Sequence, residues 1–481
     1  MRQLLTESLL ISCFGGATGF ALGYLGREVI PHLYSSPWRP PSLHSDFDHR
    51  IFLFALTVSL GTGLLFGLAP ALQLTRQDVN TGLKDTSGST TRRRKGLAGS
   101  GLITLQVALS VLLVIGAGLF SRTLINLNRN HLGFDPQGIL LFTLQAPASH
   151  FPGEEAISLH QRMEASLRLV PGVSSVTLSM SPILAHYSST VNFQPSEQEK
   201  RDEKNDGIHN NTVGQSFFET YRIPLLYGRS FTSTDTASSP PVAVINQALA
   251  RRFYPNLNPV GKTFHNPEKN AAPIQIIGVV SDALYEELQG TPPPTFYLYY
   301  PQVKFQEQMT FVVKTSRRPE DLLPAIRRAV ADVDRDLPLL DVRTQQEQIN
   351  DSIAQERLFA LLTVSFGILA LILACIGIYG VMAYNVARRV NEIGIRIALG
   401  ARPSEVRNMV LRESSWMALI GIAVGLATSF WLTRFVKSML YELQPTDPAI
   451  FIGAALLLLF VSLSSAYGPA RRAVRIDPME A

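Results

Sequence analysis

The chain has 481 residues, of which 46% are hydrophobic and only 17% charged, and its mean hydropathy is positive. This composition excludes a wholly water-soluble protein and indicates a membrane protein with a soluble part. The net charge of +5 is mild, and two cysteines, Cys13 and Cys375, argue against a zinc site or a disulfide framework.

Six apolar runs have the length and composition of membrane-spanning helices: Leu4–Tyr24, Ile51–Leu72, Leu102–Phe120, Leu358–Val386, Trp416–Phe435 and Ile450–Tyr467. A signal peptide is the competing interpretation of the first run. Basic groups at Arg76, Arg92–Lys95, Arg388–Arg412 and Arg471–Arg475 all fall on one side if the spans alternate. Basic residues favour the cytoplasmic side, so Ser121–Glu356 is predicted to lie outside.

This long segment alternates strand-like and helical patterns. Predicted strands are Gly138–Leu144, Val173–Met180, Val242–Ile245, Ile274–Val280, Thr295–Tyr299, Thr310–Lys314 and Leu339–Val342, and predicted helices are Glu154–Leu169 and Pro319–Val333. Such mixing predicts an α+β domain. The fold class is therefore an α-helical transmembrane protein with about six spans and one α+β extracytoplasmic domain.

A polar, basic segment separates the fourth and fifth apolar runs. Within it, Val390–Ala401 has the periodicity of a short amphipathic helix. Val390, Ile393 and Ile397 share one face, and Arg389, Glu392 and Arg396 share the other. Glu392 precedes Arg396 by four residues, the favourable order for an ion pair. Gly400 is predicted to end the helix and Pro403 to begin the next. The pattern alone fits either a helix resting on lipid or one pushed by a soluble partner.

Residues 389–401, R-V-N-E-I-G-I-R-I-A-L-G-A, resemble the signature R-x-x-E-I-G-I-R-x-A-L-G-A of FtsX-like permeases, the MacB class of ABC transporter membrane subunits. The resemblance implies a coupling helix, residues 388–401, that contacts a separate ATPase. The contact residues that it implies are Arg389, Glu392, Ile393, Gly394, Arg396, Leu399 and Gly400. Residues 217–229, 242–262 and 469–481 are similar to further runs of the family, which implies a MacB-type periplasmic core domain.

The segment Leu4–Ser8 is similar to Val410–Ser414, and each precedes a Gly-rich apolar run, a short loop and another apolar run. Such self-similarity indicates a duplicated unit, and it resembles the duplicated orphan-permease branch with a truncated first half. We expect residues 1–76 to be a remnant of the first unit and 77–101 a cytoplasmic linker. Residues 102–122 are expected to form a transmembrane helix, 123–356 the outer domain and 357–481 the permease domain. An alternative start or a fragment would explain the short first half.

Gly261-Lys262-Thr263 looks like the end of a phosphate-binding loop, but Asn256 stands where the earlier glycine is required. The nine histidines show no paired metal spacing, and His186, His209 and His265 are expected at the surface. The sequence thus predicts no enzyme, no metal site and no cofactor, with ATP used by a separate partner subunit.

The leading interpretation is a permease subunit that transmits movement from a cytoplasmic ABC ATPase to the outer domain through Leu102–Phe120 and Leu358–Val386, with export from the envelope as the result. The alternatives are a signalling or scaffold protein that controls an envelope hydrolase, and a non-functional truncated copy. The expected partners are the ATPase, the lipid membrane, a second permease chain or a permease dimer, and a periplasmic adaptor, but no nucleic acid. The expected location is the bacterial inner membrane, with several spans and a periplasmic domain.

Overall fold

The computed structural model describes residues 2–34, 48–75, 97–147, 149–151, 153–185, 189–191, 193–196, 207–265, 272–303 and 308–474. The chain divides into two compact units. We call Met1–Gly118, Thr363–Val436 and Pro445–Ala481 the helical unit, and Leu119–Leu362 with Lys437–Gln444 the sheet unit. Helices α4 and α10 each have residues in both units.

The helices that contribute to the helical unit are α1 (Arg2–Tyr34), α2 (His49–Thr75), α4 (Leu97–Arg129), α10 (Ala354–Arg388), α11 (Val390–Ala398), α12 (Pro403–Leu432) and α13 (Pro448–Ala473). Among the described residues, four helices are long and apolar enough to cross a membrane: Gly101–Arg129, Ala354–Arg388, Pro403–Leu432 and Pro448–Ala473. The searched parts of the first two helices, Leu9–Leu25 and His49–Thr62, are shorter. The predicted number of six spans is therefore not confirmed.

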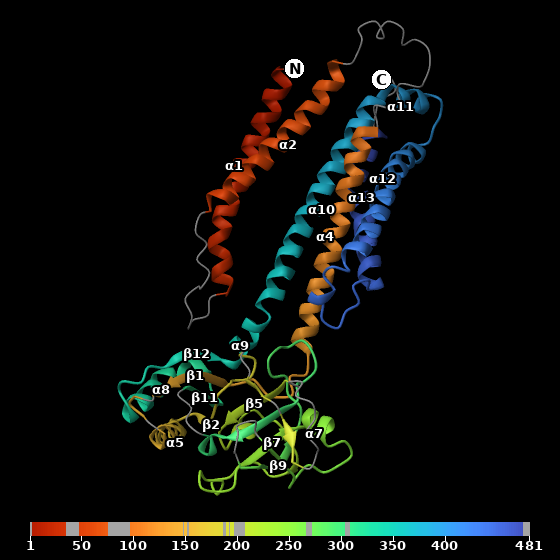
Figure 1. Ribbon diagram of the computed structural model, residues 1–481. Helices are drawn as coiled ribbons and strands as arrows, with labels where there is room; N and C mark the ends of the chain where they lie inside the picture. The colour runs from red at the N-terminus through yellow and green to blue at the C-terminus, as the bar shows by residue number, and fades with distance from the viewer. Residues whose placement is uncertain are drawn as a thin grey trace. The chain divides into compact units, whose positions relative to one another are not determined.

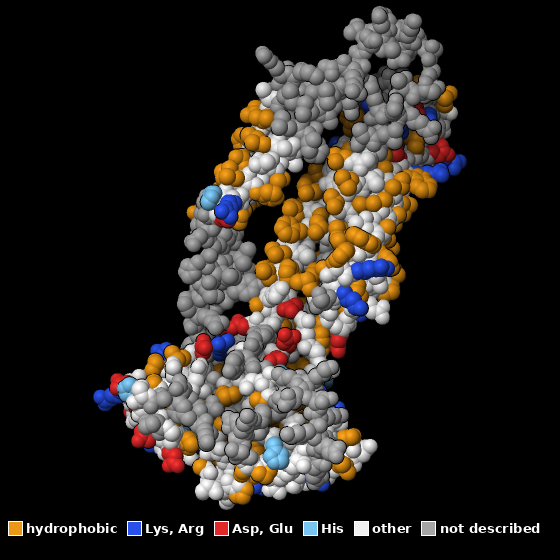
Figure 2. All heavy atoms as spheres, viewed as in Figure 1, with side chains coloured by type: hydrophobic (Ala, Val, Ile, Leu, Met, Phe, Trp, Pro, Cys, Tyr) orange, Lys and Arg blue, Asp and Glu red, His pale blue; other side chains and the backbone are white. Residues whose placement is uncertain are grey.

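Hydrophobic side chains cover much of the visible surface of the long helices (Figure 2). On α10, for example, Leu369, Ile372 and Ile376 are about half exposed or more. Exposed side chains of this kind are stable in contact with lipid tails, not water. Helix α4 is the most enclosed of the four, with 39% of its apolar window buried. Helices α10, α12 and α13 all pack against α4, since Gly367, Gly425 and Ile450 lie against its residues Ala117, Val111 and Gly118 respectively.

Both halves of the predicted repeat form pairs of contacting helices, α1 with α2 and α12 with α13. In the first pair, Ser59 Oγ donates a hydrogen bond of 2.9 Å to Ser12 O, and the rings of Phe20 and Phe52 meet edge to face. A Ser hydroxyl that bonds a neighbouring helix satisfies its polar atom where water is scarce. The origin of the pairs by duplication stays a prediction.

The sheet unit is built on one mixed sheet, shown in Figure 1, whose order in the described residues is β12-β1-β11-β2-β5-β10-β7-β9-β8-β4, with β3 on β5 and β6 on β9. Most neighbours are antiparallel, but β10 with β5 and β7 with β9 are parallel. The strands are β1 (Ile139–Gln145), β2 (Val173–Ser179), β3 (Ser189–Val191), β4 (Gln194–Pro195), β5 (Ile208–Val213), β6 (Leu225–Gly228), β7 (Val242–Asn246), β8 (Thr263–His265), β9 (Ile274–Val280), β10 (Thr295–Tyr299), β11 (Gln308–Thr315) and β12 (Leu340–Thr344).

Shorter helices accompany this sheet: α5 (Glu154–Arg168), α6 (Phe217–Thr220), α7 (Gln247–Phe253), α8 (Pro319–Val333) and α9 (Gln345–Ser352). Helices α5 and α8 contact each other and pack on β2 and β1, whereas α7 packs on β7, β9 and β10. Every strand and helix predicted for this segment is present within a few residues. The strands β3–β6 and β8 and the helices α6, α7 and α9 were not predicted.

Strand β5, Ile-His-Asn-Asn-Thr-Val, is polar in sequence yet almost entirely buried. Asn211, with no exposed surface, bonds Ser179 Oγ and both the N–H and the carbonyl of Ser181. Buried amides are tolerated when their hydrogen bonds are satisfied. The same burial makes the prediction for His209 wrong, because this side chain is only 8% exposed, with Nδ1 3.8 Å from Glu286 Oε1. His265 is exposed as predicted, and His186 lies outside the described residues.

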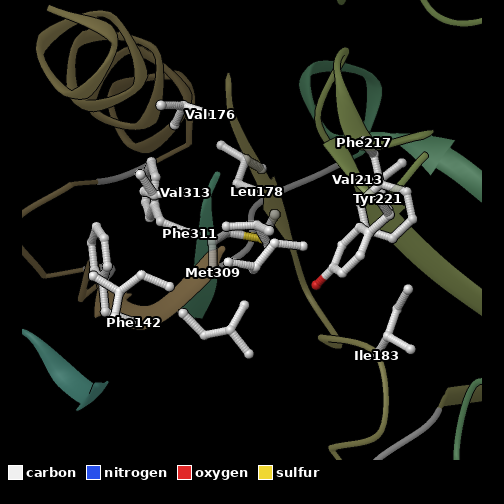
Figure 3. Packing of buried hydrophobic residues seen from close by; sticks show 14 of the residues in the cluster. Phe142, Val176, Leu178, Ile183, Val213, Phe217, Tyr221, Met309, Phe311 and Val313 are labelled. Carbon is white, nitrogen blue, oxygen red and sulfur yellow. The ribbon is translucent and has the colours of Figure 1, made fainter. Parts of the chain in front are cut away.

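The core between the sheet and α5 is aromatic. Phe142 of β1 and Phe311 of β11 stack with centroids 5.5 Å apart (Figure 3). The ring of His160, on α5, meets Phe311 and Tyr300 edge to face. His160 is 2% exposed, and its Nε2 has no hydrogen-bond partner among the described residues. Burial lowers the pKa of His160 to about 4.

We expect His160 to make stability fall in acid. Between pH 6.5 and about 4 the unfolded chain binds a proton at His160 and the folded chain does not, so unfolding becomes easier as pH falls. Between pH 7 and 4.5 the free energy of unfolding of His160→Phe should therefore fall by about 2 to 3 kcal/mol less than that of the native chain. Native-state hydrogen exchange of β1 and β11 at the two pH values measures the difference. An equal acid loss in both proteins contradicts this prediction.

Glu164, one turn along α5, has the opposite effect on the pH dependence. Burial raises the pKa of its carboxyl group, although the Arg168 guanidinium, 2.6 Å away, opposes this shift. Stability from a raised carboxyl pKa is greatest in acid and is lost as pH rises through the folded pKa. Because Glu164 is unchanged in His160→Phe, comparing the two proteins isolates His160.

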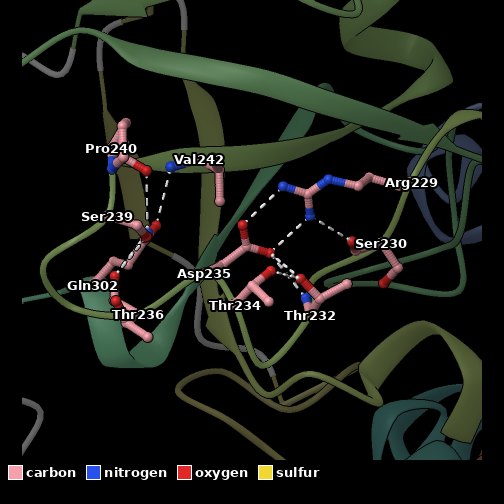
Figure 4. A network of polar contacts seen from close by, with 10 residues as sticks. All are labelled: Arg229, Ser230, Thr232, Thr234, Asp235, Thr236, Ser239, Pro240, Val242 and Gln302. Carbon is pink, nitrogen blue, oxygen red and sulfur yellow. Dashed lines mark hydrogen bonds and ion pairs between the residues drawn. The ribbon is translucent and has the colours of Figure 1, made fainter.

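A polar network fixes the loop between β6 and β7 (Figure 4). The Asp235 carboxylate, 5% exposed, accepts two bonds from Arg229, of 2.7 and 2.8 Å. It also accepts bonds from the N–H and the hydroxyl of Thr232. The bonds from Arg229 hold the pKa of Asp235 below its usual range. Gln302 binds the part of the loop that precedes β7. Its Oε1 accepts the N–H of Val242, and its Nε2 donates to Thr236 O, Ser239 Oγ and Pro240 O.

Candidate functional site

Helix α11 is a short segment between the long helices α10 and α12. Gly400 follows its end with φ +93°, a conformation that favours glycine. The N–H of Gly400 bonds Ile397 O and the N–H of Ala401 bonds Arg396 O, both at 3.0 Å, which is the Schellman arrangement. Helix α12 then begins at Pro403. The predicted roles of Gly400 and Pro403 are therefore confirmed, although α11 is shorter than residues 388–401.

One face of α11 is turned into the protein. Ile393 is 1% exposed and Gly394 is buried, while Val390 and Ile397 are half-buried. This is the apolar face that the periodicity predicts. Ile393 and Gly394 are among the predicted contact residues, but because they are buried they are not accessible to a partner protein.

The charged side chains of α11 are exposed and held in ion pairs. Arg396 Nη2 donates 2.8 Å to Glu392 Oε1 across one helical turn, as predicted. Arg389 Nη1 donates 3.0 Å to Glu413 Oε2 on α12. Exposed pairs of this kind contribute little to stability, about 0 to 1 kcal/mol each. Their main effect is to fix the direction of the side chains and to join the start of α11 to α12.

Two large apolar side chains stand among these charges. Leu399 is 83% exposed and Ile395 is 61% exposed. Together with Glu392 and Arg396 they occupy positions i, i+3, i+4 and i+7, which share one side of a helix. We call Glu392, Ile395, Arg396 and Leu399 the α11 surface. Sequence reasoning missed Ile395, although its spacing of four from Leu399 was a signal for it.

Five of the seven predicted contact residues are thus exposed, and two are buried. The exposed ones are Arg389, Glu392, Arg396, Leu399 and Gly400. An exposed surface with apolar side chains framed by charges is typical of a protein contact, because the apolar atoms give affinity and the charges give orientation. Contact of any of these residues with an ATPase stays a prediction.

Lys262 lies in a different setting from a phosphate-binding loop. Residues Gly261 and Lys262 lead into the strand β8 (Thr263–His265), whereas a phosphate-binding loop opens a helix. This excludes the phosphate-loop interpretation. Among the described residues, no three His, Cys, Asp or Glu side chains gather where they could hold a metal ion.

The fold and the α11 surface define a class: a multi-pass helical membrane protein with an α+β unit and a short amphipathic helix between two spans. Within this class, residues 364–478 match the FtsX-like permease C-terminal family and residues 100–332 match the MacB-like periplasmic core domain. The chain therefore belongs to the FtsX-like, MacB-type permeases, and its α+β unit is extracytoplasmic.

Curated relatives of the chain are named as export ATP-binding/permease proteins. The macrolide export ATP-binding/permease protein MacB of Mannheimia succiniciproducens is 24% identical over 281 residues, which are 56% of this chain and 42% of the relative. MacB of Bartonella quintana is 28% identical over 413 residues, which are 81% of this chain and 57% of the relative. The chain thus spans only about half the length of these relatives. The crystal structure of the periplasmic region of MacB from Actinobacillus actinomycetemcomitans is 16% identical and covers 48% of this chain and 98% of that one, with a TM-score of 0.32.

Proposed function

We propose that the chain is the membrane permease subunit of an ABC-type transport system, in which a partner ATPase drives movements of the extracytoplasmic unit and so expels a substrate from the envelope. The α11 surface carries this proposal. It combines the exposed Leu399 and Ile395 with the fixed charges of Glu392 and Arg396. ATP is used by the partner, and the chain itself contributes no catalytic group.

The position of α11 supports the cytoplasmic side for this contact. Many arginines surround it: Arg388, Arg389, Arg396, Arg402, Arg407 and Arg412. Positive charge near span ends favours the cytoplasmic face, which is where ATP is available. We therefore propose that in a bacterium the chain lies in the cytoplasmic membrane, with the sheet unit in the periplasm.

Two unbroken helices supply a route for the movement. Helix α10 begins in the sheet unit at Ala354 and ends at Arg388, and only Arg389 separates it from α11. Helix α4 also has residues in both units. A helix transmits displacement along its axis because its backbone hydrogen bonds resist local bending. A push on α11 can therefore appear at the sheet unit. A second permease chain and a periplasmic adaptor complete the assembly that we propose.

Leu399→Asp tests the contact directly. Leu399 is the C-cap residue of α11, and Leu169 is the C-cap residue of α5 in the sheet unit, with the same exposure of 83%. An aspartate costs each helix a similar small amount at its C-terminus. We expect Leu399→Asp to weaken ATPase binding about 10- to 100-fold, the effect of losing an interface anchor, and Leu169→Asp to leave it unchanged.

Co-purification of the tagged chain from its native host, with mass spectrometry of the bound proteins, is the measurement. Glu392→Lys combined with Arg396→Glu is the second variant, because it can keep the ion pair of α11 while it reverses the charge pattern. Loss of the same ATPase from both α11 variants, but not from Leu169→Asp, supports the proposal. An ATPase that binds all of the proteins equally, or none that binds the native chain, contradicts it.

A further inference from the structure

The connection between α12 and α13 belongs to the sheet unit, although both helices belong to the helical unit. The chain leaves the helical unit after Val436 and returns at Pro445, and Lys437–Gln444 lies within the sheet unit. Tyr441 is its anchor, because the half-buried ring packs against the main core of that unit. The chain thus passes from one unit to the other on both sides of this loop, as it does within α4 and α10.

Hydrogen bonds fix Tyr441 to the outer end of α4. Asn130 Nδ2 donates 2.6 Å to the Tyr441 hydroxyl, and Asn126 Nδ2 lies 3.5 Å from Tyr441 O. Asn126 lies in the last turn of α4, and Asn130 directly follows the end of the helix at Arg129. Burial raises the pKa of Tyr441, so the hydroxyl stays neutral at physiological pH.

The same asparagine continues the connection toward α10. Asn130 Nδ2 also donates 2.9 Å to Leu288 O, and the next residue, Gln289, donates 2.7 Å from Nε2 to Glu356 Oε1. Glu356 lies in the first turn of α10. The stacked rings of Phe120 on α4 and Phe359 on α10, with centroids 5.7 Å apart, lie beside this route.

We propose that these contacts form one belt, composed of Tyr441, Asn130, Leu288, Gln289 and Glu356, which joins α4, α10 and the α12–α13 connection. Tyr441 is a positioning residue in this belt. It makes the α12–α13 connection follow the movement of the two long helices, so that α12 and α13 take part in transmission. This inference rests on the proposed function for the movement, but the belt itself is a property of the chain alone.

The belt is tested in the purified full-length chain, without an ATPase, by hydrogen exchange with mass spectrometry. Tyr441→Phe keeps the ring and removes the hydroxyl, and exchange of amides 437–444 should become about three to ten times faster, the factor for one lost hydrogen bond. Gln289→Ala cuts the belt at its far end and should accelerate the same amides by about twofold or more. Tyr227→Phe, at an exposed tyrosine on β6, is the control and should change nothing there.

The double variant decides whether the contacts act as a unit. In a connected belt, Tyr441→Phe with Gln289→Ala accelerates exchange by less than the product of the two single effects, because the first cut already releases the loop. If Gln289→Ala leaves amides 437–444 unchanged, or if the two effects multiply, the belt is overturned and Tyr441 is only a local contact.

The transmitting role is tested in the complex with the co-purified ATPase. A non-hydrolysable ATP analogue should change exchange of amides 437–444 in the native complex and leave them unchanged in Tyr441→Phe, while α11 responds in both. A response of α11 without any response of the loop in the native complex overturns the role of Tyr441 and leaves the proposed function intact. If no ATPase co-purifies, the proposed function fails, and the exchange of the chain alone still decides the belt.

Discussion

Gly425→Leu is expected to separate α12 from α4 and to destabilise the helical unit by about 3 kcal/mol or more, the upper range for overpacking. A Cβ atom at Gly425 would lie 2.8 Å from Ala108 O and 2.7 Å from Val111 Cβ. A Cβ at Gly421, one turn earlier, would lie 2.9 Å from Thr104 O. Backbone atoms cannot give way as a flexible side chain can, so the helices must move apart. Small residues spaced by four are the usual means of close helix contact in membranes.

The control for this prediction is Gly453→Leu on α13. A Cβ there would meet nothing within 4 Å in the described structure, and Leu should even favour the helix. Thermal unfolding in detergent, followed by circular dichroism at 222 nm, compares the two variants. A melting temperature for Gly425→Leu that equals that of Gly453→Leu would show that the α4–α12 contact is looser than the structure has it.

Asn246→Ala is expected to loosen the centre of the sheet unit by about 3 kcal/mol or more. Asn246, 1% exposed at the end of β7, accepts the N–H of Leu249 at 3.0 Å and of Thr295 at 2.9 Å. Its Nδ2 donates 2.8 Å to Pro293 O. Alanine would leave two N–H groups and one carbonyl unpaired, and each buried unpaired group costs about 1 to 3 kcal/mol. One side chain thus starts α7 and fixes the approach to β10.

Asn246→Asp is the matched variant, because it keeps both acceptor bonds and loses only the bond to Pro293. At neutral pH we expect Asn246→Asp to lower the stability clearly less than Asn246→Ala, because both acceptor bonds are kept. If burial of the charge outweighs these bonds, lowering the pH should restore the stability. Native-state hydrogen exchange of β7 and β10 amides in the full chain measures both. Equal exchange in Asn246→Ala and the native chain would contradict the role of this side chain.

Sequence periodicity predicted the parts of the chain whose structure depends on near neighbours. Local patterns account for the four long apolar helices, the strands β1, β2, β7 and β9–β12, the helices α5 and α8, and the end of α11 just before Gly400. Periods of two and of 3.6, a glycine able to adopt positive φ and a proline at a helix start act over a few residues. The resemblance to FtsX-like permeases has the same source, because its motifs are short and continuous.

Local patterns failed where a distant contact decides the outcome. Strand β5 is polar and was missed, because its Asn211 is satisfied by Ser179 and Ser181, about thirty residues away in the chain. His209 was expected at the surface for the same reason. Periodicity could place Ile393 and Ile395 on different faces of α11, but it could not show that the folded chain buries Ile393 and leaves Ile395 exposed.

The sequence by itself determined the class of this protein, the limits of most of its helices and strands, and the segment that carries the candidate site. The tertiary structure alone decided which side of α11 is open, which asparagines hold the sheet unit together, and that Tyr441 belongs with Asn130. The physical reason is the distance along the chain over which each property is determined. Backbone preference and apolar periodicity are set within a few residues, whereas burial and hydrogen bonding of a polar side chain depend on groups that only the folded chain brings within 3 Å.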